Sequence, residues 1–239
     1  MTFVETLKAG LDAWQIPYTE EQIEKLTAVN RMVMEANEHM NLTAIPDGEP
    51  SAKKHFLDSL NPPTLAKIRS CKAIIDVGSG AGFPGLPLAI MCPEVSVTLM
   101  DSRKKRVVFL AEVIETLGIA NAKTLTGRAE DIGRDPAHRE KYDVACARAV
   151  ASLPTLLEYL TPLVKVGGQA LCYKGSDIQK ELKSSKAAVR VLGCGKLCLE
   201  KYTLFSEKQE LNIVTAPKIR ATSTQFPRLP GKPSKSPIQ

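Results

Sequence analysis

The chain lacks any segment that could cross a membrane or direct secretion. No apolar run in the 239 residues approaches the roughly 18 residues that a spanning helix needs. The N-terminal segment carries Glu5 and Asp12 and has no basic-then-apolar leader. We therefore expect a cytoplasmic protein with no membrane partner.

Cysteine and histidine are too scattered for a structural metal site. Of the six cysteines only Cys194 and Cys198 lie close together, and the histidines at 39, 55 and 138 are not near them. A zinc site needs about four closely spaced soft ligands. We expect no metal, and we interpret the cysteines as reduced, buried apolar side chains.

Acidic residues are missing from the end of the chain. Residues 217–239 contain no Asp or Glu but five basic side chains and five prolines, so they supply five of the formal net charge of +6. A basic, proline-rich tail suits a polyanionic partner such as RNA, whose phosphates it would neutralise. Charge alone favours a solvated tail with no partner equally well.

The first part of the chain, residues 1–65, is expected to form a helical cap without strands. Residues 19–22 read Thr-Glu-Glu-Gln, a capping box, and apolar residues then recur at helical spacing to about His39. A shorter helix is expected over 51–60, before Pro62 and Pro63.

Strands and helices alternate over residues 66–216. Short apolar strands are expected at 73–77, 95–100, 122–126, 142–147 and 168–173, and helices at 84–92, 104–117, 153–164 and 178–192. The last two strands, 197–205 and 210–216, have no helix between them and should pair antiparallel at one edge. The pattern predicts an α/β fold with a mainly parallel, doubly wound seven-stranded sheet, followed by the tail 217–239.

A glycine-rich loop follows the first of these strands and reads Asp76-Val-Gly78-Ser-Gly80-Ala-Gly82-Phe-Pro-Gly85. Glycines at such a turn let the backbone approach a ligand, and the following helix presents free N–H groups. The loop also satisfies the dinucleotide pattern, so a nicotinamide-dependent dehydrogenase has to be weighed.

Acids and prolines around the loop favour a different cofactor. Asp76 would repel a pyrophosphate but attract an ammonium group, and Pro84 and Pro87 remove N–H donors that would hold phosphate. Asp101 ends the next strand, where a carboxylate accepts hydrogen bonds from ribose hydroxyls. The pattern is that of enzymes that use S-adenosylmethionine (SAM). We predict a class I SAM-dependent methyltransferase with a Rossmann-like core.

Two absent motifs restrict the methyl acceptor. No Asp/Asn-Pro-Pro-aromatic motif, typical of enzymes that methylate exocyclic base amines, follows the strand 142–147, and Cys146 is not in the Pro-Cys pair common in cytosine carbon-5 methylation. The remaining acceptors are already nucleophilic, such as a ring nitrogen or an alcohol. Guanine N7 is attractive because its lone pair needs no deprotonation, so alignment matters more than a general base.

Several longer runs in the chain are distinctive. They are His55-Phe-Leu-Asp58-Ser59-Leu60, the glycine loop continued to Ile90, Leu99-Met-Asp101-Ser-x-x-Lys-Arg106, Gly127-Arg-Ala-Glu130 and Ala147-Arg-Ala-Val-Ala-Ser-Leu153. With Asn41-Leu-Thr43 and Phe226-Pro-Arg-x-Pro-Gly-x-Pro toward the two ends, these runs resemble the RsmG (GidB) family of bacterial 16S rRNA methyltransferases. The resemblance implies methyl transfer from SAM to N7 of a guanine in the 530 loop of 16S rRNA, with S-adenosylhomocysteine as the second product.

Together with the loop, the resemblance implies a set of site residues. For the cofactor they are Asp76, Gly78, Gly80, Phe83, Asp101, Ser102, Ala129, Glu130 and Arg148, and Arg148 is also the expected catalytic residue next to the target base. The expected RNA contacts are Lys104, Lys105, Arg106, Lys174, Arg228 and Lys232. The expected partner is 16S rRNA or the small ribosomal subunit, and the protein is expected to be a monomer. A methyltransferase for a small molecule and a non-catalytic RNA-binding module remain as alternatives.

Overall fold

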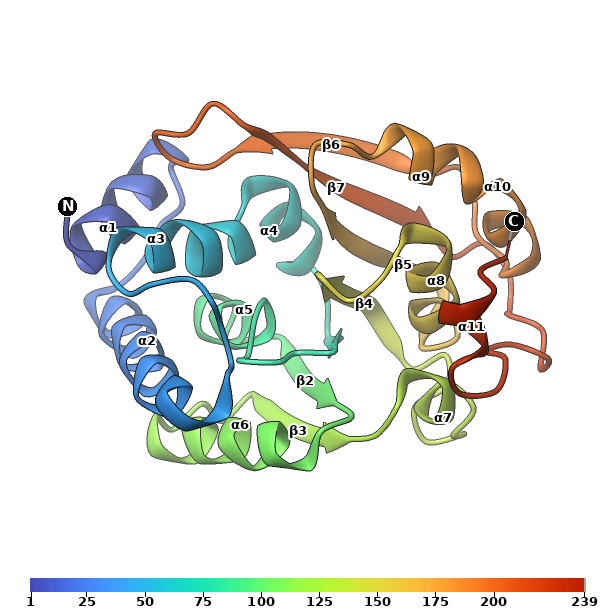
Figure 1. Cartoon of the computed structure of the whole chain (residues 1–239), viewed down its shortest axis with the longest axis horizontal. Coiled ribbons are helices and arrows are strands. Elements are labelled where there is room, and N and C mark those ends of the chain that lie inside the picture. The colour runs from blue at the N-terminus through green and yellow to red at the C-terminus, as the bar shows by residue number, and fades with distance from the viewer. Residues whose placement is uncertain (239) are drawn as a thin grey trace.

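A computed structural model describes residues 1–238 and places a seven-stranded sheet between two layers of helices (Figure 1). The strands are β1 (Ala73–Val77), β2 (Ser96–Asp101), β3 (Ala122–Thr126), β4 (Tyr142–Arg148), β5 (Val164–Lys174), β6 (Cys198–Thr203) and β7 (Glu210–Pro217). Their order is β3-β2-β1-β4-β5-β7-β6. β1 to β5 pair in parallel, and β7 pairs antiparallel with both β5 and β6. The predicted mainly parallel sheet with an antiparallel edge is confirmed.

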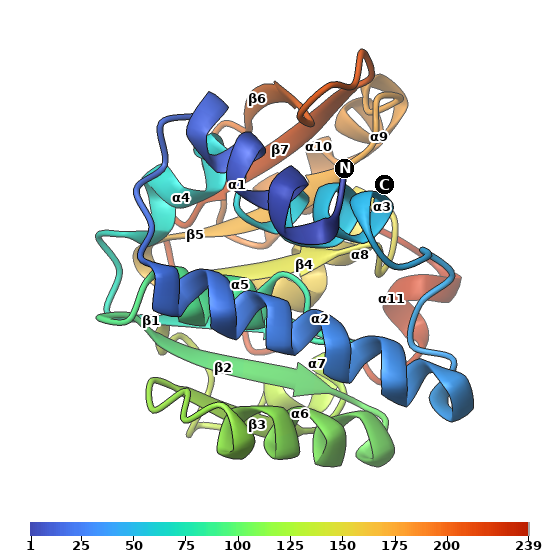
Figure 2. The ribbon, with the colours of Figure 1, turned by 90° about the vertical axis from the view of Figure 1, so that its left-hand side faces the viewer.

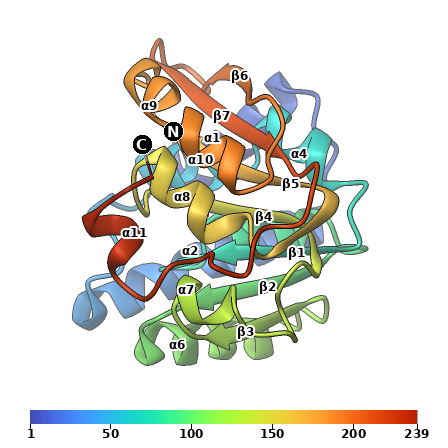
Figure 3. The same cartoon turned by 90° about the vertical axis from the view of Figure 1, so that its right-hand side faces the viewer.

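Both faces of the sheet are covered because the central strands are apolar on both sides. In β1, Ile74 packs into the core on one face, while Ile75 and Val77 pack into the core on the other. The first face carries the cap, α5 (Gly85–Met91) and α6 (Lys104–Thr116). The second carries α7 (Ala129–Ile132), α8 (Leu153–Leu160), α9 (Gln179–Ser184) and α10 (Lys186–Val191) (Figure 3).

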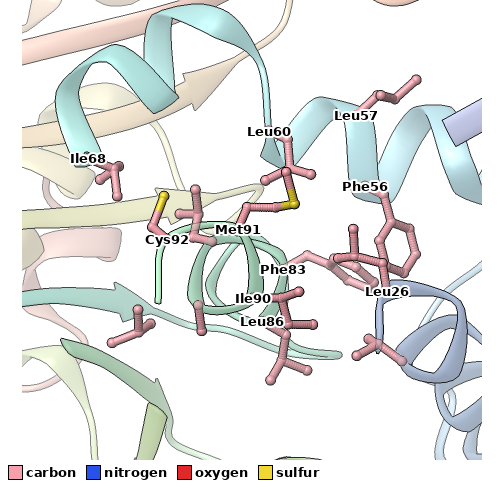
Figure 4. Close-up of a cluster of buried hydrophobic side chains, with 14 of the residues drawn as sticks. Leu26, Phe56, Leu57, Leu60, Ile68, Phe83, Leu86, Ile90, Met91 and Cys92 are labelled. Atoms are coloured by element: carbon pink, nitrogen blue, oxygen red, sulfur yellow. The ribbon is translucent and has the colours of Figure 1, made fainter. Parts of the chain in front are cut away.

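The cap consists of α1 (Phe3–Ala13), α2 (Glu20–Met40), α3 (Glu49–Ser51), the π-helix η1 (Ala52–Leu57) and α4 (Pro62–Ile68). The capping box Thr19–Gln22 forms and starts α2. The single helix expected over 51–60 is instead the short α3 followed by η1. Figure 2 shows α2 lying across α5 and next to α6, and Figure 4 shows the apolar side chains of α2, η1 and α4 meeting those of α5. The cap therefore shares the core of the sheet's first face.

The helix expected over 178–192 is also divided. α9 ends and α10 begins at Ser185, whose hydroxyl donates to the carbonyl of Glu181 at 2.6 Å. A serine hydroxyl that bonds to a backbone carbonyl competes with the regular helical pattern, and apolar periodicity does not reveal this competition.

The basic tail is folded back over α7 and α8 (Figure 3). It includes α11 (Lys232–Lys235). Arg139 holds it by donating to the carbonyls of Thr222, Ser223 and Phe226 at 2.6, 3.2 and 2.9 Å. The tail is thus packed on the second face, and its backbone is a hydrogen-bond partner of the core.

Candidate functional site

The glycine loop lies where β1 ends, at the carboxyl edge of the parallel strands. Gly78, Gly80 and Gly82 have φ values of +78°, +59° and +101°, a region that side chains with a Cβ rarely adopt. The N–H of Gly78 donates to the carbonyl of Met100 at 2.7 Å, which ties the loop to β2. A Cβ on Gly78 would lie 2.9 Å from a methyl group of Val150, so the loop is closely approached from the β4 side.

Asp76 lies fully buried beneath this loop. Its Oδ2 accepts a hydrogen bond from the N–H of Gly85 at 3.0 Å, and Gly85 has to be glycine because a Cβ would lie 2.8 Å from that oxygen. Oδ1 has no hydrogen-bond partner among the described residues. Burial raises the pKa of Asp76 to about 6. A cationic ligand group near the loop would stabilise the ionised carboxylate.

Asp101 links the end of β2 to the same loop. Its Oδ2 accepts from the N–H of Gly80 at 3.0 Å, and its Oδ1 accepts from the N–H of Arg103 at 2.8 Å. Arg106, expected to contact RNA, instead points to Asp101, with 3.4 Å between Nη1 and Oδ2. The two carboxylate oxygens keep lone pairs that suit a pair of ribose hydroxyls.

Arg148 is the centre of a polar cluster at the end of β4. Its Nη1 lies 2.7 Å from Oδ2 of Asp58 and donates to the carbonyls of Lys54 and His55 at 3.0 and 3.3 Å. Its guanidinium also lies 5.4 Å from the centre of the Phe83 ring. Arg148 thus joins the cap, through η1, to the glycine loop.

His55, in η1, connects this cluster to the segment between α2 and α3. Its ring stacks on Phe83 at 4.5 Å, Nδ1 lies 3.2 Å from Nη2 of Arg148, and Nε2 lies 2.8 Å from the hydroxyl of Thr43. Because a guanidinium only donates, we assign Nδ1 as the acceptor and Nε2–H as the donor to Thr43. Burial and the charge of Arg148 lower the pKa of His55 to about 3. His55 is therefore a neutral group that helps to orient Arg148.

We expect His55→Asn to change how stability depends on pH. The pKa of His55 is about 3 in the folded state and near 6.5 in the unfolded state. Below pH 6.5 the unfolded state therefore binds more protons at this residue than the folded state, and the wild type loses stability as the pH falls. The difference in unfolding free energy between wild type and variant should shrink by about 2 kcal/mol from pH 7.5 to pH 5. Urea unfolding at both pH values measures it. An equal difference at both would contradict the assigned pKa.

The remaining predicted cofactor residues lie around the same edge. Phe83 is buried between His55 and Phe56, Ser102 is exposed, and Ala129 and Glu130 begin α7 and are nearly buried. Glu130 does not face the edge freely, because its Oε1 accepts from the N–H of Gly231 in the tail at 2.9 Å. The structure therefore brings a tail residue to the place expected for the adenine.

The predicted RNA contacts divide into two groups. Lys174 pairs with Glu181 at 2.7 Å and Arg228 pairs with the buried Glu158 at 2.7 Å, as Arg106 does with Asp101. The exposed Lys104, Lys105 and Lys232 form no ion pair within residues 1–238.

Two hollows flank the loop. One, of about 970 Å³, lies between α2 and α6 and is lined by Met32, Met40, residues 103–106 and Phe109, among others. The other, of about 560 Å³, lies beyond Arg148 and reaches the connection between β6 and β7. No cluster of three potential metal ligands occurs in residues 1–238, and no helix there is long and apolar enough to cross a bilayer.

Asp58 and Tyr202 were not assigned to the site from sequence. Tyr202 donates its hydroxyl to Oδ1 of Asp58, which holds that carboxylate against Arg148. Asp58 follows His55 by three residues, a helical spacing that places both on one side, and this signal was available. Tyr202 lies 144 residues from Asp58, and no local pattern connects them.

The orphaned oxygen of Asp76 and the acceptor pair of Asp101 fit the ammonium and ribose parts of SAM. Solved methyltransferases share this fold. An O-methyltransferase from Bacillus cereus in complex with SAH has a TM-score of 0.57 at 16% identity, covering 90% of this chain and 100% of that one. Cofactor-bound Rv0187 from MTB has a TM-score of 0.57 at 14% identity, covering 82% and 91%. The fold is therefore that of the class I SAM-dependent methyltransferases.

The sequence comparisons identify the family. The family model described as "GidB: rRNA small subunit methyltransferase G" matches residues 22–211. Proteins named ribosomal RNA small subunit methyltransferase G are 46% identical in Acetivibrio thermocellus, over 96% of this chain and 94% of that protein, and 44% identical in Alkaliphilus metalliredigens, over 98% of each. The chain belongs to the GidB family of small-subunit rRNA methyltransferases.

Proposed function

We propose that this protein transfers the methyl group of SAM to N7 of one guanine in the 530 loop of 16S rRNA. The observation that carries the proposal is that neither His55 nor Asp58, the titratable groups in contact with Arg148, is free to act as a general base. His55 has a pKa of about 3 and uses both ring nitrogens in hydrogen bonds, and both oxygens of Asp58 are engaged. An acceptor whose lone pair is already available, such as guanine N7, suits this arrangement because only alignment is required.

The residues divide the work between holding the cofactor and placing the acceptor. Bound SAM supplies a methyl group activated by the positive sulfur. The backbone of Gly78 and Gly80 would line the cofactor, Asp101 would accept hydrogen bonds from its ribose, and Asp76 holds the loop through the N–H of Gly85. Arg148, fixed by Asp58 and η1, stands between the loop and the 560 Å³ hollow, where it would orient the base. Ser102, Ala129, Glu130 and Phe83 complete the proposed cofactor surroundings.

The test is transfer of labelled methyl from SAM to small subunits and to naked 16S rRNA, both from cells that lack this modification. We expect label at N7 of a single guanine, and the better of the two forms identifies the physiological substrate. Bound SAM without label in any RNA would contradict the proposal and favour a small-molecule acceptor. An rRNA substrate implies a cytoplasmic reaction. We also propose that the protein acts as a monomer.

We propose Lys104, Lys105 and Lys232 as the RNA contacts that are available without breaking an ion pair. Lys104 and Lys105 line the 970 Å³ hollow between α2 and α6. A double Lys104→Ala/Lys105→Ala variant should raise KM for rRNA several-fold and reduce the salt-dependence slope of RNA binding by about 1.5, since each lost phosphate contact contributes about 0.7–0.9.

Lys196→Ala is the matched control, because Lys196 is exposed and lies at the edge of the sheet opposite the site. The N–H of the neighbouring Gly195 donates to the carbonyl of Pro217, which places this segment at the amino ends of the parallel strands. Filter binding of rRNA across a salt series measures both variants. An unchanged slope for the double variant would exclude Lys104 and Lys105 as phosphate contacts.

A further inference from the structure

We propose that the 560 Å³ hollow beyond Arg148 receives the target base and that Glu207 recognises it as guanine. The inference rests on the proposed function. The hollow is bounded by η1, the ends of β4 and β5, α9 and the connection between β6 and β7, which lies at the same edge of the sheet as α9 (Figure 2). Its volume falls within the range of small-molecule sites, about 300–1,000 Å³, and suffices for a nucleoside.

The walls of the hollow suit a flat aromatic ring. Ile45, Ala149, Leu204 and Leu211 contribute apolar surface, and Tyr173 lies among them. Arg148 and His55 form the end nearest the glycine loop. A base that leaves its stack is held by apolar and aromatic side chains and identified by hydrogen bonds to its edges.

Most of the charged groups in this hollow are already paired. Asp58 is engaged by Arg148 and Tyr202. Glu181 accepts from Lys174 and from the N–H of Leu153. These carboxylates stabilise the walls of the hollow and have few acceptor positions left for a ligand.

Glu207 is different. Its carboxylate forms no ion pair or hydrogen bond with any residue of 1–238, although it lines the hollow and is only partly exposed. Its N–H donates to the carbonyl of Leu204 at 2.9 Å and the preceding Ser206 adopts a φ of +60°, so a tight turn places Glu207 at the hollow. At this position the carboxylate has both oxygens available to a ligand.

Guanine presents two adjacent N–H donors, N1–H and the N2 amino group, and a carboxylate can accept from both at once. Adenine, cytosine and uracil do not offer that pair. N7 lies on the opposite edge of the guanine ring. With the donor edge on Glu207, N7 would face the other end of the hollow, where Arg148 and the glycine loop stand. Recognition and alignment would then use opposite edges of one base.

The test combines E207Q with rRNA that carries inosine at the labelled guanine, because inosine retains N7 and lacks the N2 amino group. E207Q should lower kcat/KM on guanine by about 5- to 150-fold, which corresponds to about 1–3 kcal/mol for a two-bond base contact, with an unchanged Kd for SAM. Inosine should impose a similar loss on the wild type but little further loss on E207Q. E210Q is the matched control, since Glu210 lies outside the hollow and pairs with Lys201 at 2.8 Å; it should behave as wild type.

An equal inosine penalty in wild type and E207Q, or kcat/KM of E207Q equal to that of E210Q, would overturn the assignment of Glu207 while leaving guanine methylation intact. Failure of the wild type to label any guanine would instead overturn the proposed function.

Discussion

Arg148→Met is expected to lower kcat for methyl transfer by about 10²–10³-fold, the range for removal of one preorganised polar group from an active site. The variant should also lose roughly 2–3 kcal/mol of unfolding free energy, because Asp58, with 13% of its side chain exposed, would keep its charge without its partner. Single-turnover kinetics with saturating SAM and urea unfolding measure the two effects separately.

A second variant separates chemistry from stability. Asp58→Asn/Arg148→Met removes the unpaired charge, so it should recover most of the lost stability while the low kcat persists. Recovery of both would show that Arg148 acts only through the fold. Wild-type kcat in the single variant would exclude a catalytic role for Arg148.

The pair between Arg228 and Glu158 predicts the largest effect on stability. Glu158 is fully buried and accepts from Nε and Nη2 of Arg228, at 2.9 and 2.7 Å. Arg228→Met should cost roughly 3 kcal/mol, because a carboxylate without solvent or a counter-charge remains in the interior. Arg228→Met/Glu158→Gln should recover much of this loss.

Lys235→Met provides the control for this pair. Lys235 lies in the same tail, is exposed and forms no ion pair in the described residues, so its replacement should change the unfolding free energy by less than about 0.5 kcal/mol. Equal stabilities of Arg228→Met and Lys235→Met in urea would show that the buried pair does not anchor the tail.

The tail shows how charge counting and structure differ. Its composition suits a phosphate-binding segment as well as a solvated tail, yet Lys218 is buried against Glu140 at 3.0 Å and Arg228 pairs with the buried Glu158. Deleting residues 217–239 would leave the buried Glu158 without its partner and Arg139 with only the carbonyl of Gly133, so reduced RNA binding by the truncated protein would not isolate an electrostatic contact. Single substitutions of exposed lysines do so.

The sequence by itself determined the class of fold and the chemistry of the loop. Three local patterns carried this information. The alternation of apolar strands and helices reflects strand burial, the run from Asp76 to Gly85 reflects the backbone freedom of glycine, and Asp101 stands at the end of a strand. Each pattern depends only on residues that are close together in the chain. The antiparallel edge followed likewise from a missing helix between β6 and β7.

Only the tertiary structure decided which charges face a ligand. Arg148 and Asp58 are 90 residues apart, Arg228 and Glu158 are 70 apart, and Glu130 meets Gly231 across 101 residues. A charged side chain that is removed from water needs a partner of opposite charge or a hydrogen-bonding group. Which residue supplies that partner depends on the order of the strands and on how the tail packs. That requirement engages Arg106, Lys174 and Arg228 with acids, while Lys104, Lys105 and Glu207 keep charges that no described residue neutralises.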